Sequence, residues 1–380
     1  MNNLPLPHAA NQWMKCNGSH AAQLVHPGVP GELSQSRLEG RACHEVAQKM
    51  IAALRAEPDA PLFGELVGSL SKDGTVVTQE LFDAAREYVN DVTGEARKHD
   101  LVRELKVEQP VRLDHIAAGW FGIPDVWLYV PSQRLLIIWD AKFGHEVIDV
   151  VEHWPMLIYA MGITDTLDVD VIEFRIVQPR AFTSEGIVRK WCCTFDELVS
   201  YQEQLVTTLS SVLSDSPPCV TGPQCKKCSA RAHCDTLQRT GYESVDYAAD
   251  LQTHSLSGHT LGVELKLLQR AAEMIKYRLS GLEEQALHEL RSGNSVPFFG
   301  VKEGKGRQRW RKDVPVEQII MMGDLMGQDL RKPVELDTPA QVRKKGIDAD
   351  VVEQYSETPS TGLKLVPIDE KHVKNVFERK

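Results

Sequence analysis

Two short apolar runs on either side of a break constrain this chain most. The runs are Val126–Val130 (VWLYV) and Leu135–Trp139 (LLIIW), and Pro131, Ser132 and Gln133 lie between them. β-Branched and aromatic residues around a turn-forming break predict a β-hairpin. With Ser132 and Gln133 as the turn, Asp125 falls opposite Asp140, with Cβ atoms about 5 Å apart.

Three charged side chains, Asp125, Asp140 and Lys142, lie at the open end of this hairpin. Lys142 shares a face with Asp140, because side chains in a strand alternate with period two. Two carboxylates at such a short distance repel each other unless a cation lies between them. Oxygen ligands suit Mg²⁺ or Mn²⁺, so the pattern predicts a metal site, and a chance pattern of surface charge is the alternative.

Composition sets the broad class of the protein. The chain has 380 residues, 42% of them hydrophobic, and a net charge of −10. This length suggests two or three domains, or one large domain with an appendage. Nucleic-acid contacts would have to come from local basic patches. No run of 18 apolar residues and no secretion signal is present, so we expect a cytoplasmic protein that does not bind a membrane.

An amphipathic helix is predicted over residues 36–55. Its apolar stripe recurs every four residues at Ala42, Val46, Met50 and Leu54. His44 lies off this stripe, so by itself it is interpreted as a surface or hydrogen-bonded imidazole. Glu108 and Arg112, in a strand that leads into the hairpin, could lie near the site, but they are interpreted as solvated charges.

The segment after Lys142 predicts a second helix and a further strand. Pro155 is acceptable only in the first turn, so this helix should begin near Trp154 and carry Tyr159 one turn later. The strand that follows ends at Gln178-Pro-Arg180, because proline cannot continue a ladder. Gln178 and Arg180 could contact a phosphate there, and a structural loop end is the alternative.

Cysteines cluster in the later part of this region. Cys225, Cys228 and Cys234 form a C-x₂-C-x₅-C pattern, which strongly indicates metal binding. A fourth ligand is needed. Cys219 is the local candidate and would complete a zinc site. Cys16 is isolated and, without further information, is interpreted as a half-buried small residue.

The ordered set of motifs resembles the PD-(D/E)XK nucleases in their RecB-like branch, and in particular a phage-encoded family of that branch. The motifs are W-x-x-C-x-G-S at 13–19, E-G-x-x-x-H-E at 39–45, G-x-x-D at 122–125, D-x-K-x-G at 140–144, V-Q-P-R at 177–180 and C-x-x-C-x-A-x-A-x-C at 225–234. One position departs from the pattern. Pro155 stands where RecB-like nucleases carry the Gln of Q-x-x-x-Y, which leaves open a changed substrate contact or lowered activity.

The resemblance implies a fold and a site. The fold is α/β: a PD-(D/E)XK restriction-endonuclease-like core over residues 1–240, with a mixed sheet flanked by helices, and a helical and β-hairpin C-terminal extension over 241–380. The metal ligands would be His44, Asp125 and Asp140. Asp125, Asp140, Lys142 and Tyr159 would be the catalytic residues, with Lys142 orienting water or stabilising the transition state and Tyr159 positioning DNA.

A second resemblance concerns the cysteines. The AddB-type and CRISPR-adaptation nucleases carry one cysteine before the nuclease core and three after it. By that likeness Cys16 joins Cys225, Cys228 and Cys234 around a 4Fe-4S iron–sulfur cluster that staples the two ends of the domain, with zinc as the alternative.

Beyond residue 240 a long helix and a basic hairpin are predicted. The hairpin tip gathers cations around an aromatic ring and suits contacts to the DNA backbone and bases, with a solvated tip as the alternative; its DNA-binding candidates are Lys305, Arg307, Arg309, Trp310 and Arg311. The resulting hypothesis is a metal-dependent DNA exonuclease of phage recombination or degradation. It would act in the host cytoplasm with a phage single-strand-binding or annealing protein. The alternative is an inactive nuclease fold that binds DNA and holds zinc.

Overall fold

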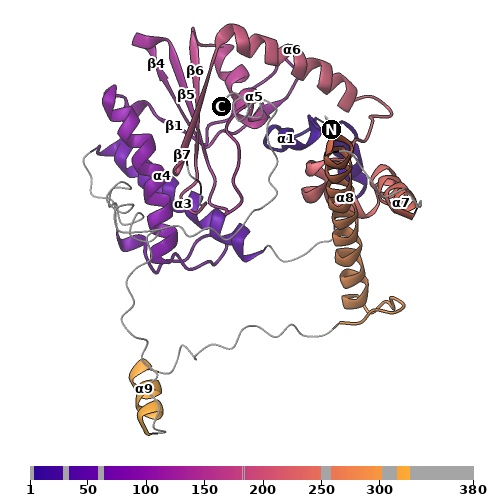
Figure 1. The fold of residues 1–380 in the computed structure, drawn as a ribbon. Helices are drawn as coiled ribbons and strands as arrows, with labels where there is room; N and C mark the ends of the chain where they lie inside the picture. Colours follow the sequence, from indigo (N-terminus) through magenta and orange to yellow (C-terminus); the bar gives the residue numbers. More distant parts are fainter. Residues whose placement is uncertain are drawn as a thin grey trace, which may run out of the picture. The chain divides into compact units, whose positions relative to one another are not determined.

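The computed structural model describes residues 4–28, 34–58, 64–181, 183, 185–249, 258–301 and 315–325 (Figure 1). Contacts divide the chain into two compact units, Met1–Lys302 and Glu303–Lys380. Within the second unit the structure describes the helix α9 (Val316–Leu325). The first unit extends past residue 240, and the domain boundary suggested there stays a prediction.

A five-stranded mixed sheet forms the centre of the first unit. Its strands lie in the order β1-β4-β5-β6-β7, and only β5 and β6 pair in parallel. The strands are β1 (Lys106–Val107), β4 (Val126–Val130), β5 (Leu135–Ala141), β6 (Val171–Val177) and β7 (Val188–Thr194). Helices cover both faces, so the predicted α/β fold with a mixed, helix-flanked sheet is confirmed.

The β4–β5 hairpin has the predicted register but not the predicted turn. Val126 pairs with Trp139, and Val130 pairs with Leu135. The connection is four residues long instead of two: Pro131–Gln133 form the 3-10 turn η4, and Arg134 is left-handed at φ 47°. Proline has no N–H to give to the ladder, so pairing stops at Val130 while the centre of the turn is unchanged.

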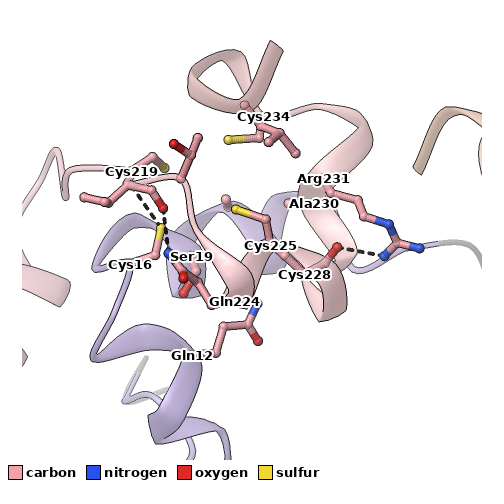
Figure 2. A pocket seen from close by; sticks show the side chains of 14 residues that line it. Gln12, Cys16, Ser19, Cys219, Gln224, Cys225, Cys228, Ala230, Arg231 and Cys234 are labelled. Atoms are coloured by element: carbon pink, nitrogen blue, oxygen red, sulfur yellow. Dashed lines mark hydrogen bonds between the residues drawn. The ribbon is translucent and has the colours of Figure 1, made fainter. Parts of the chain in front are cut away.

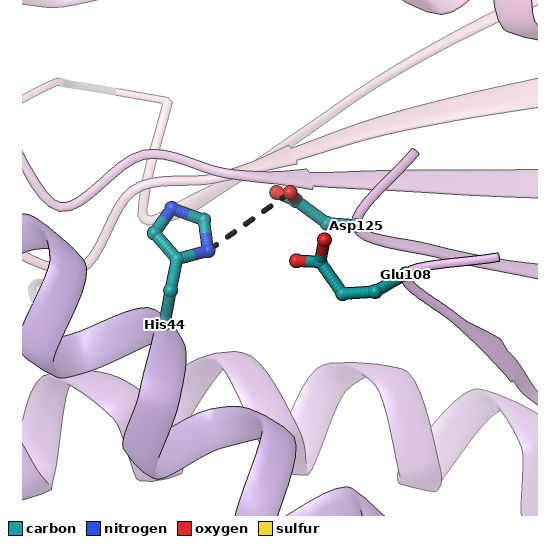
Figure 3. Close-up of side chains that lie close together, drawn as sticks. All are labelled: His44, Glu108 and Asp125. Carbon is teal, nitrogen blue, oxygen red and sulfur yellow. Dashed lines mark ion pairs between the residues drawn. The ribbon is translucent and has the colours of Figure 1, made fainter. Parts of the chain in front are cut away.

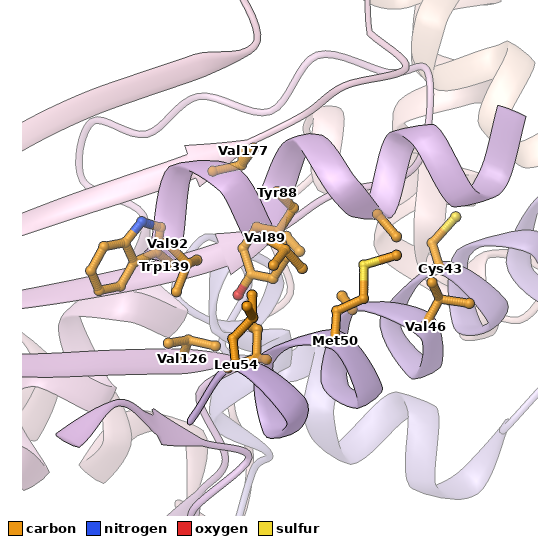
Figure 4. Close-up of a cluster of buried hydrophobic side chains, with 14 of the residues drawn as sticks. Cys43, Val46, Met50, Leu54, Tyr88, Val89, Val92, Val126, Trp139 and Val177 are labelled. Carbon is orange, nitrogen blue, oxygen red and sulfur yellow. The ribbon is translucent and has the colours of Figure 1, made fainter. Parts of the chain in front are cut away.

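One face of the sheet packs against α3 (Gln35–Ala56) and α4 (Gln79–Lys98). The predicted stripe of α3 is buried there against Tyr88, Val89 and Val92 of α4 and Val126 and Trp139 of the sheet (Figure 4). Thr78 begins α4 by accepting a hydrogen bond from the Leu81 amide. The two helices therefore hold the sheet edge near the hairpin in a fixed place.

The other face packs against α5 (Trp154–Thr164) and α6 (Phe195–Val212). The helix α5 begins at Trp154, as Pro155 predicts, and is buried from Pro155 to Ile163. It lies in the crossover between the parallel strands β5 and β6. Leu136 and Ile138 of β5 belong to this core, whereas Ile137 and Trp139 belong to the opposite one, so β5 is buried on both faces.

The N-terminal and cysteine-rich segments lie together beside this core. Gly18 donates a backbone hydrogen bond to Pro218, 200 positions along the chain. The elements involved are η1 (Pro7–Ala9), α1 (Ala10–Trp13), α2 (Gly18–Val25), η5 (Pro223–Lys227), η6 (Ser229–Ala232), α7 (Asp235–Ala249) and α8 (Gly258–Arg291). A side chain on Gly281 would meet the Arg231 side chain and the Ala232 amide, so α8 packs directly on η6.

The remaining elements are short: η2 (Gly64–Leu66), η3 (Val102–Glu104) and a two-stranded sheet of β2 (Val111–Arg112) and β3 (Phe121–Gly122). The long helix predicted beyond residue 240 is confirmed as α8, and Gly293 follows it at φ 88°. The predicted basic hairpin tip, with Lys305, Arg307, Arg309, Trp310 and Arg311, lies outside the described residues. None of the described helices is long and apolar enough to span a membrane.

Candidate metal centre and cysteine cavity

The open end of the β4–β5 hairpin brings the two predicted carboxylates together. Asp125 directly precedes β4, and Asp140 lies near the end of β5. One oxygen of Asp125 accepts a hydrogen bond from the Ala141 amide at 2.7 Å. The ammonium of Lys142 lies 2.6 Å from the Asp140 carboxylate.

A histidine and a further glutamate complete a group of possible metal ligands. His44 of α3 points its Nδ1 atom at Asp125 Oδ1, 3.9 Å away (Figure 3). The ring is held edge-on against Phe143, with the two ring centres 5.0 Å apart. His44, Glu108 and Asp125 each offer one ligand atom, and these atoms all lie within 4.8 Å of one another. This spacing matches the chemistry of a divalent-cation site built from carboxylate and imidazole.

Glu108 is the residue that sequence reasoning interpreted differently. It follows β1, and its own amide donates to the Asp125 carbonyl at 3.0 Å. Its backbone is left-handed at φ 48°, and Gln48 donates to its carboxylate at 2.9 Å. Because β1 is two residues long, no alternating pattern marked it, and only its pairing with β4 places Glu108 beside Asp125.

The local charges differ between the carboxylates. Burial raises the pKa of Asp125, and the negative charge of Asp140 adds to this effect while His44 opposes it. Desolvation and the charge of Asp125 also raise the pKa of Glu108. Burial works against the charged form of Asp140 too, but the neighbouring Lys142 prevails and lowers its pKa. The negative charges of Glu108 and Asp125 are therefore not balanced by a neighbouring lysine, as that of Asp140 is. This is the charge pattern expected of a cation site.

Two side chains of the α5 region face the carboxylates. Burial raises the pKa of the Tyr159 hydroxyl, and Asp140 and Asp125 add to that shift. Burial lowers the pKa of His153, the N-cap residue of α5, to about 4, so its ring is neutral near pH 7. Its Nδ1 atom is buried with no hydrogen-bond partner among the described residues. His153 escaped sequence reasoning because no motif singled it out.

The predicted strand-end pair, Gln178 and Arg180, holds the loop that follows Lys142. Gln178 is buried and donates to the carbonyls of Gly144 and Glu146. Arg180 lies 2.7 Å from Glu39 and 3.1 Å from Glu80, and its side chain is largely buried. A DNA contact by Arg180 stays a prediction and would require an exchange of these partners.

Five cysteines line one cavity. Cys16 comes from the N-terminal segment, and the others are Cys219, Cys225, Cys228 and Cys234 (Figure 2). The amide of Val220 donates to the Cys16 sulfur at 3.3 Å. Burial raises the pKa of Cys219 to about 12, with Cys16 and Cys234 adding to the shift. The structure therefore places both candidates for the fourth ligand, Cys16 and Cys219, with the C-x₂-C-x₅-C motif.

An ion-pair link joins the cysteine segment to the loop after Lys142. Lys226 and Lys227 of η5 lie 2.8 and 2.7 Å from the carboxylate of Glu146. Hydrogen bonds from these two lysines lower the pKa of Glu146 to about 2. The cysteine cavity and the carboxylate site thus share one connecting loop.

The fold and this site define an α/β protein with a candidate divalent-metal centre and a separate cavity of thiols. A family model described as "Protein of unknown function (DUF2800)" matches residues 6–373, so the chain belongs to this family. No curated protein matches it. Among solved structures it is similar to a phage related exonuclease from Haemophilus somnus 129PT, with 13% sequence identity and a TM-score of 0.23. That match covers 50% of this chain and 91% of the exonuclease.

Proposed function

We propose that this protein is a divalent-metal-dependent deoxyribonuclease that hydrolyses phosphodiester bonds. The observation that carries the proposal is the convergence of His44, Glu108 and Asp125 beside the Asp140–Lys142 ion pair. Carboxylates and an imidazole next to a half-buried lysine are the parts that metal-assisted phosphodiester hydrolysis needs. The resemblance to RecB-like nucleases assigns the same roles to His44, Asp125, Asp140 and Lys142.

The residues present fit Mg²⁺ or Mn²⁺. His44, Asp125 and Asp140 would hold the ion, and Glu108, whose carboxylate lies within 4.8 Å of the ligand atoms of His44 and Asp125, is a further possible ligand. A bound divalent cation supplies an activated water and neutralises charge on the scissile phosphate. Asp140 and Asp125 raise the pKa of Lys142 against the effect of its burial, so it stays protonated and stabilises negative charge in the transition state. Tyr159 would position the DNA strand.

We further propose that the thiol cavity holds a structural 4Fe-4S cluster on Cys16, Cys225, Cys228 and Cys234, with zinc as the alternative. All four cysteines line one cavity, which supports the proposal, and the donor set is that of a thiolate-ligated cluster.

The biological setting in this proposal is phage DNA recombination or degradation by exonucleolytic attack in the host cytoplasm. Lys305, Arg307, Arg309, Trp310 and Arg311 would contact the DNA backbone and bases. A phage single-strand-binding or annealing protein would be the partner. These assignments rest on the resemblance and on the composition of the basic tip.

A second candidate function is DNA binding without cleavage by an inactive nuclease fold with a structural zinc site. Pro155 favours it, because it occupies the first turn of α5 where RecB-like nucleases carry a glutamine. In this case the carboxylate group would bind a cation without turnover.

The test is a cleavage assay on single- and double-stranded DNA with Mg²⁺ or Mn²⁺. The wild-type protein should cleave DNA, whereas Asp140→Ala and Lys142→Ala should not, although both should still bind it. A matched control is Asp83→Ala, which changes a carboxylate paired with Arg86 on the surface of α4. Cleavage at the wild-type rate by either site variant would overturn the assignment, and binding without any cleavage by the wild type would favour the second candidate.

A further inference from the structure

A cavity of about 400 Å³ lies beside the candidate metal centre and is not used by the chemistry described above. Residues 6–8 of the N-terminal segment form one wall, residues 119–123 form another, and Tyr159 closes the inner end. This volume falls in the range of about 300–1,000 Å³ that is typical of small-molecule sites. The lining is rich in aromatic and aliphatic side chains.

The walls of this cavity are held by two buried indoles. The Trp120 N–H donates to the Pro5 carbonyl at 2.7 Å, and the Trp13 N–H donates to the Leu6 carbonyl at 3.1 Å. The two indole rings also contact each other, with centres 6.3 Å apart. The N-terminal segment is thereby fixed against the β2–β3 sheet, so the cavity is preformed.

Gly122 and Tyr159 connect this cavity with the carboxylate site. A side chain on Gly122 would come within 2.5 Å of the Tyr159 ring, so this ring packs directly on the glycine. Gly122 lies three residues before Asp125 in the sequence. Tyr159 also lies on α5, whose N-cap residue His153 follows the loop after Lys142. Burial raises the pKa of the Tyr159 hydroxyl, and the charges of Asp140 and Asp125 add to that shift. Tyr159 is therefore shared by the cavity and the carboxylate site.

The mouth of the cavity exposes apolar side chains next to a cation. Phe121 is 55% exposed and Ile123 is 43% exposed. Phe121 pairs directly with Arg112 across the β2–β3 sheet, so both side chains lie on one face. The ion pair of Arg112 with Asp114 is exposed to solvent, and such pairs contribute little stability. An aromatic ring beside an available guanidinium suits a base with its phosphate.

We infer that this cavity receives the unpaired base of the nucleotide that adjoins the scissile phosphodiester. The inference rests on the proposed nuclease function and adds to it a substrate class, single-stranded DNA. Phe121 would stack on the base, and Arg112 would contact its phosphate. A base within a duplex is stacked and paired, so extracting it costs free energy, whereas a base in a single strand is already unpaired.

The test uses the full chain and short single-stranded oligonucleotides, with a second set in which the base next to the cleaved bond is replaced by an abasic site. Binding is measured by fluorescence anisotropy in the Asp140→Ala background, so that it does not depend on cleavage. Phe121→Ala should weaken binding of the normal oligonucleotide about tenfold, as expected for the loss of one stacked base. Phe195→Ala, a partly exposed phenylalanine at the start of α6, is the matched control and should bind like its parent.

The decisive result is non-additivity. Removing the base should weaken binding to the parent about tenfold but have little effect on Phe121→Ala, because both changes remove the same contact. Equal sensitivity of both proteins to the abasic site would overturn the inference. Were Phe121→Ala to fold poorly, an indifference of the parent to the abasic site would overturn it equally. Cleavage of normal DNA by the wild type reports separately on the nuclease proposal, so the two can fail independently.

Discussion

The Asp125 carboxylate is anchored by the backbone amide of Ala141, which donates to one of its oxygens at 2.7 Å. The donor directly follows Asp140, so the end of β5 orients both carboxylates of the hairpin. The second oxygen of Asp125 is turned toward His44 on α3. One backbone hydrogen bond thus fixes the direction from which a cation would be held.

Glu108→Gln should weaken divalent-metal binding. The change removes a negative charge from the group of His44, Glu108 and Asp125 and leaves the side-chain volume nearly unchanged. Mutation of a residue that only hydrogen-bonds to a metal ligand already lowers metal affinity by about 10–100-fold. Mutation of a direct ligand should lower the affinity at least as much. Calorimetric titration with Mn²⁺ measures the effect. Glu104→Gln, an exposed change nearby, serves as control, and equal affinities for both variants would remove Glu108 from the site.

Cys16→Ala and Cys219→Ala separate the two interpretations of the thiol cavity. A cluster on Cys16 closes a loop of more than 200 residues, and by analogy with a disulfide this constrains the unfolded chain by about 4–5 kcal/mol. Cys16→Ala should therefore lose the metal and become protease-sensitive, while Cys219→Ala keeps both metal and stability. Metal content, the anaerobic absorption spectrum and the melting temperature decide. The opposite pattern indicates a local zinc site on Cys219.

Removing Lys226 and Lys227, which pair with Glu146, should make the loop that follows Lys142 more mobile. The double change Lys226→Ala and Lys227→Ala deletes both ion pairs to Glu146. These pairs are exposed to solvent, so the global stability of the protein should hardly change. Amide hydrogen exchange over residues 144–148 should nevertheless speed up. Lys190→Ala is a control on β7. Unchanged exchange in the double variant would mean that Gln178 and Arg180 hold the loop without the two lysines.

Glu95 should contribute pH-dependent stability through Arg175. Burial favours the neutral form of Glu95, but hydrogen bonds from Lys98 and Arg175 prevail and lower its pKa to about 2. Because the folded-state pKa lies below the ordinary value of 4.5, this stability is present above about pH 4.5 and is lost as the pH falls toward 2. Glu95→Gln should lower the free energy of unfolding by about 2 kcal/mol at pH 7.

Urea denaturation at several pH values measures this difference. The gap between the wild type and Glu95→Gln should shrink between pH 4.5 and 2, and the exposed Glu87→Gln should show no gap at any pH. A gap that is independent of pH would assign the loss to packing instead of charge.

Charge reversal at Arg307, Arg309 and Arg311 should weaken DNA binding and flatten its salt dependence. Each phosphate contact adds about 0.9 to the slope of log affinity against log salt for duplex DNA. Titrations at several salt concentrations measure the slope, and an unchanged slope would move the DNA groove to another part of the protein.

Local patterns in the sequence predicted much of this structure. The position of the break between the two apolar runs predicted the β4–β5 register, because the centre of the turn decides which residues lie opposite each other. Pro155 marked the start of α5, since the missing proline N–H acts within a single turn. These signals are local, and the structure retains them.

Other features were decided only by the tertiary structure. Glu108 joins Asp125 because a two-residue strand pairs at the sheet edge, and Cys16 and Cys219 both reach the thiol cavity because α2 packs beside η6. Arg180 faces Glu39 and Glu80 because β6 ends beside α3 and α4. These long-range contacts depend on the order of strands in the sheet and on the burial of whole helix faces, and both involve segments far apart in the chain. The spacing of neighbouring residues in the sequence therefore does not predict them.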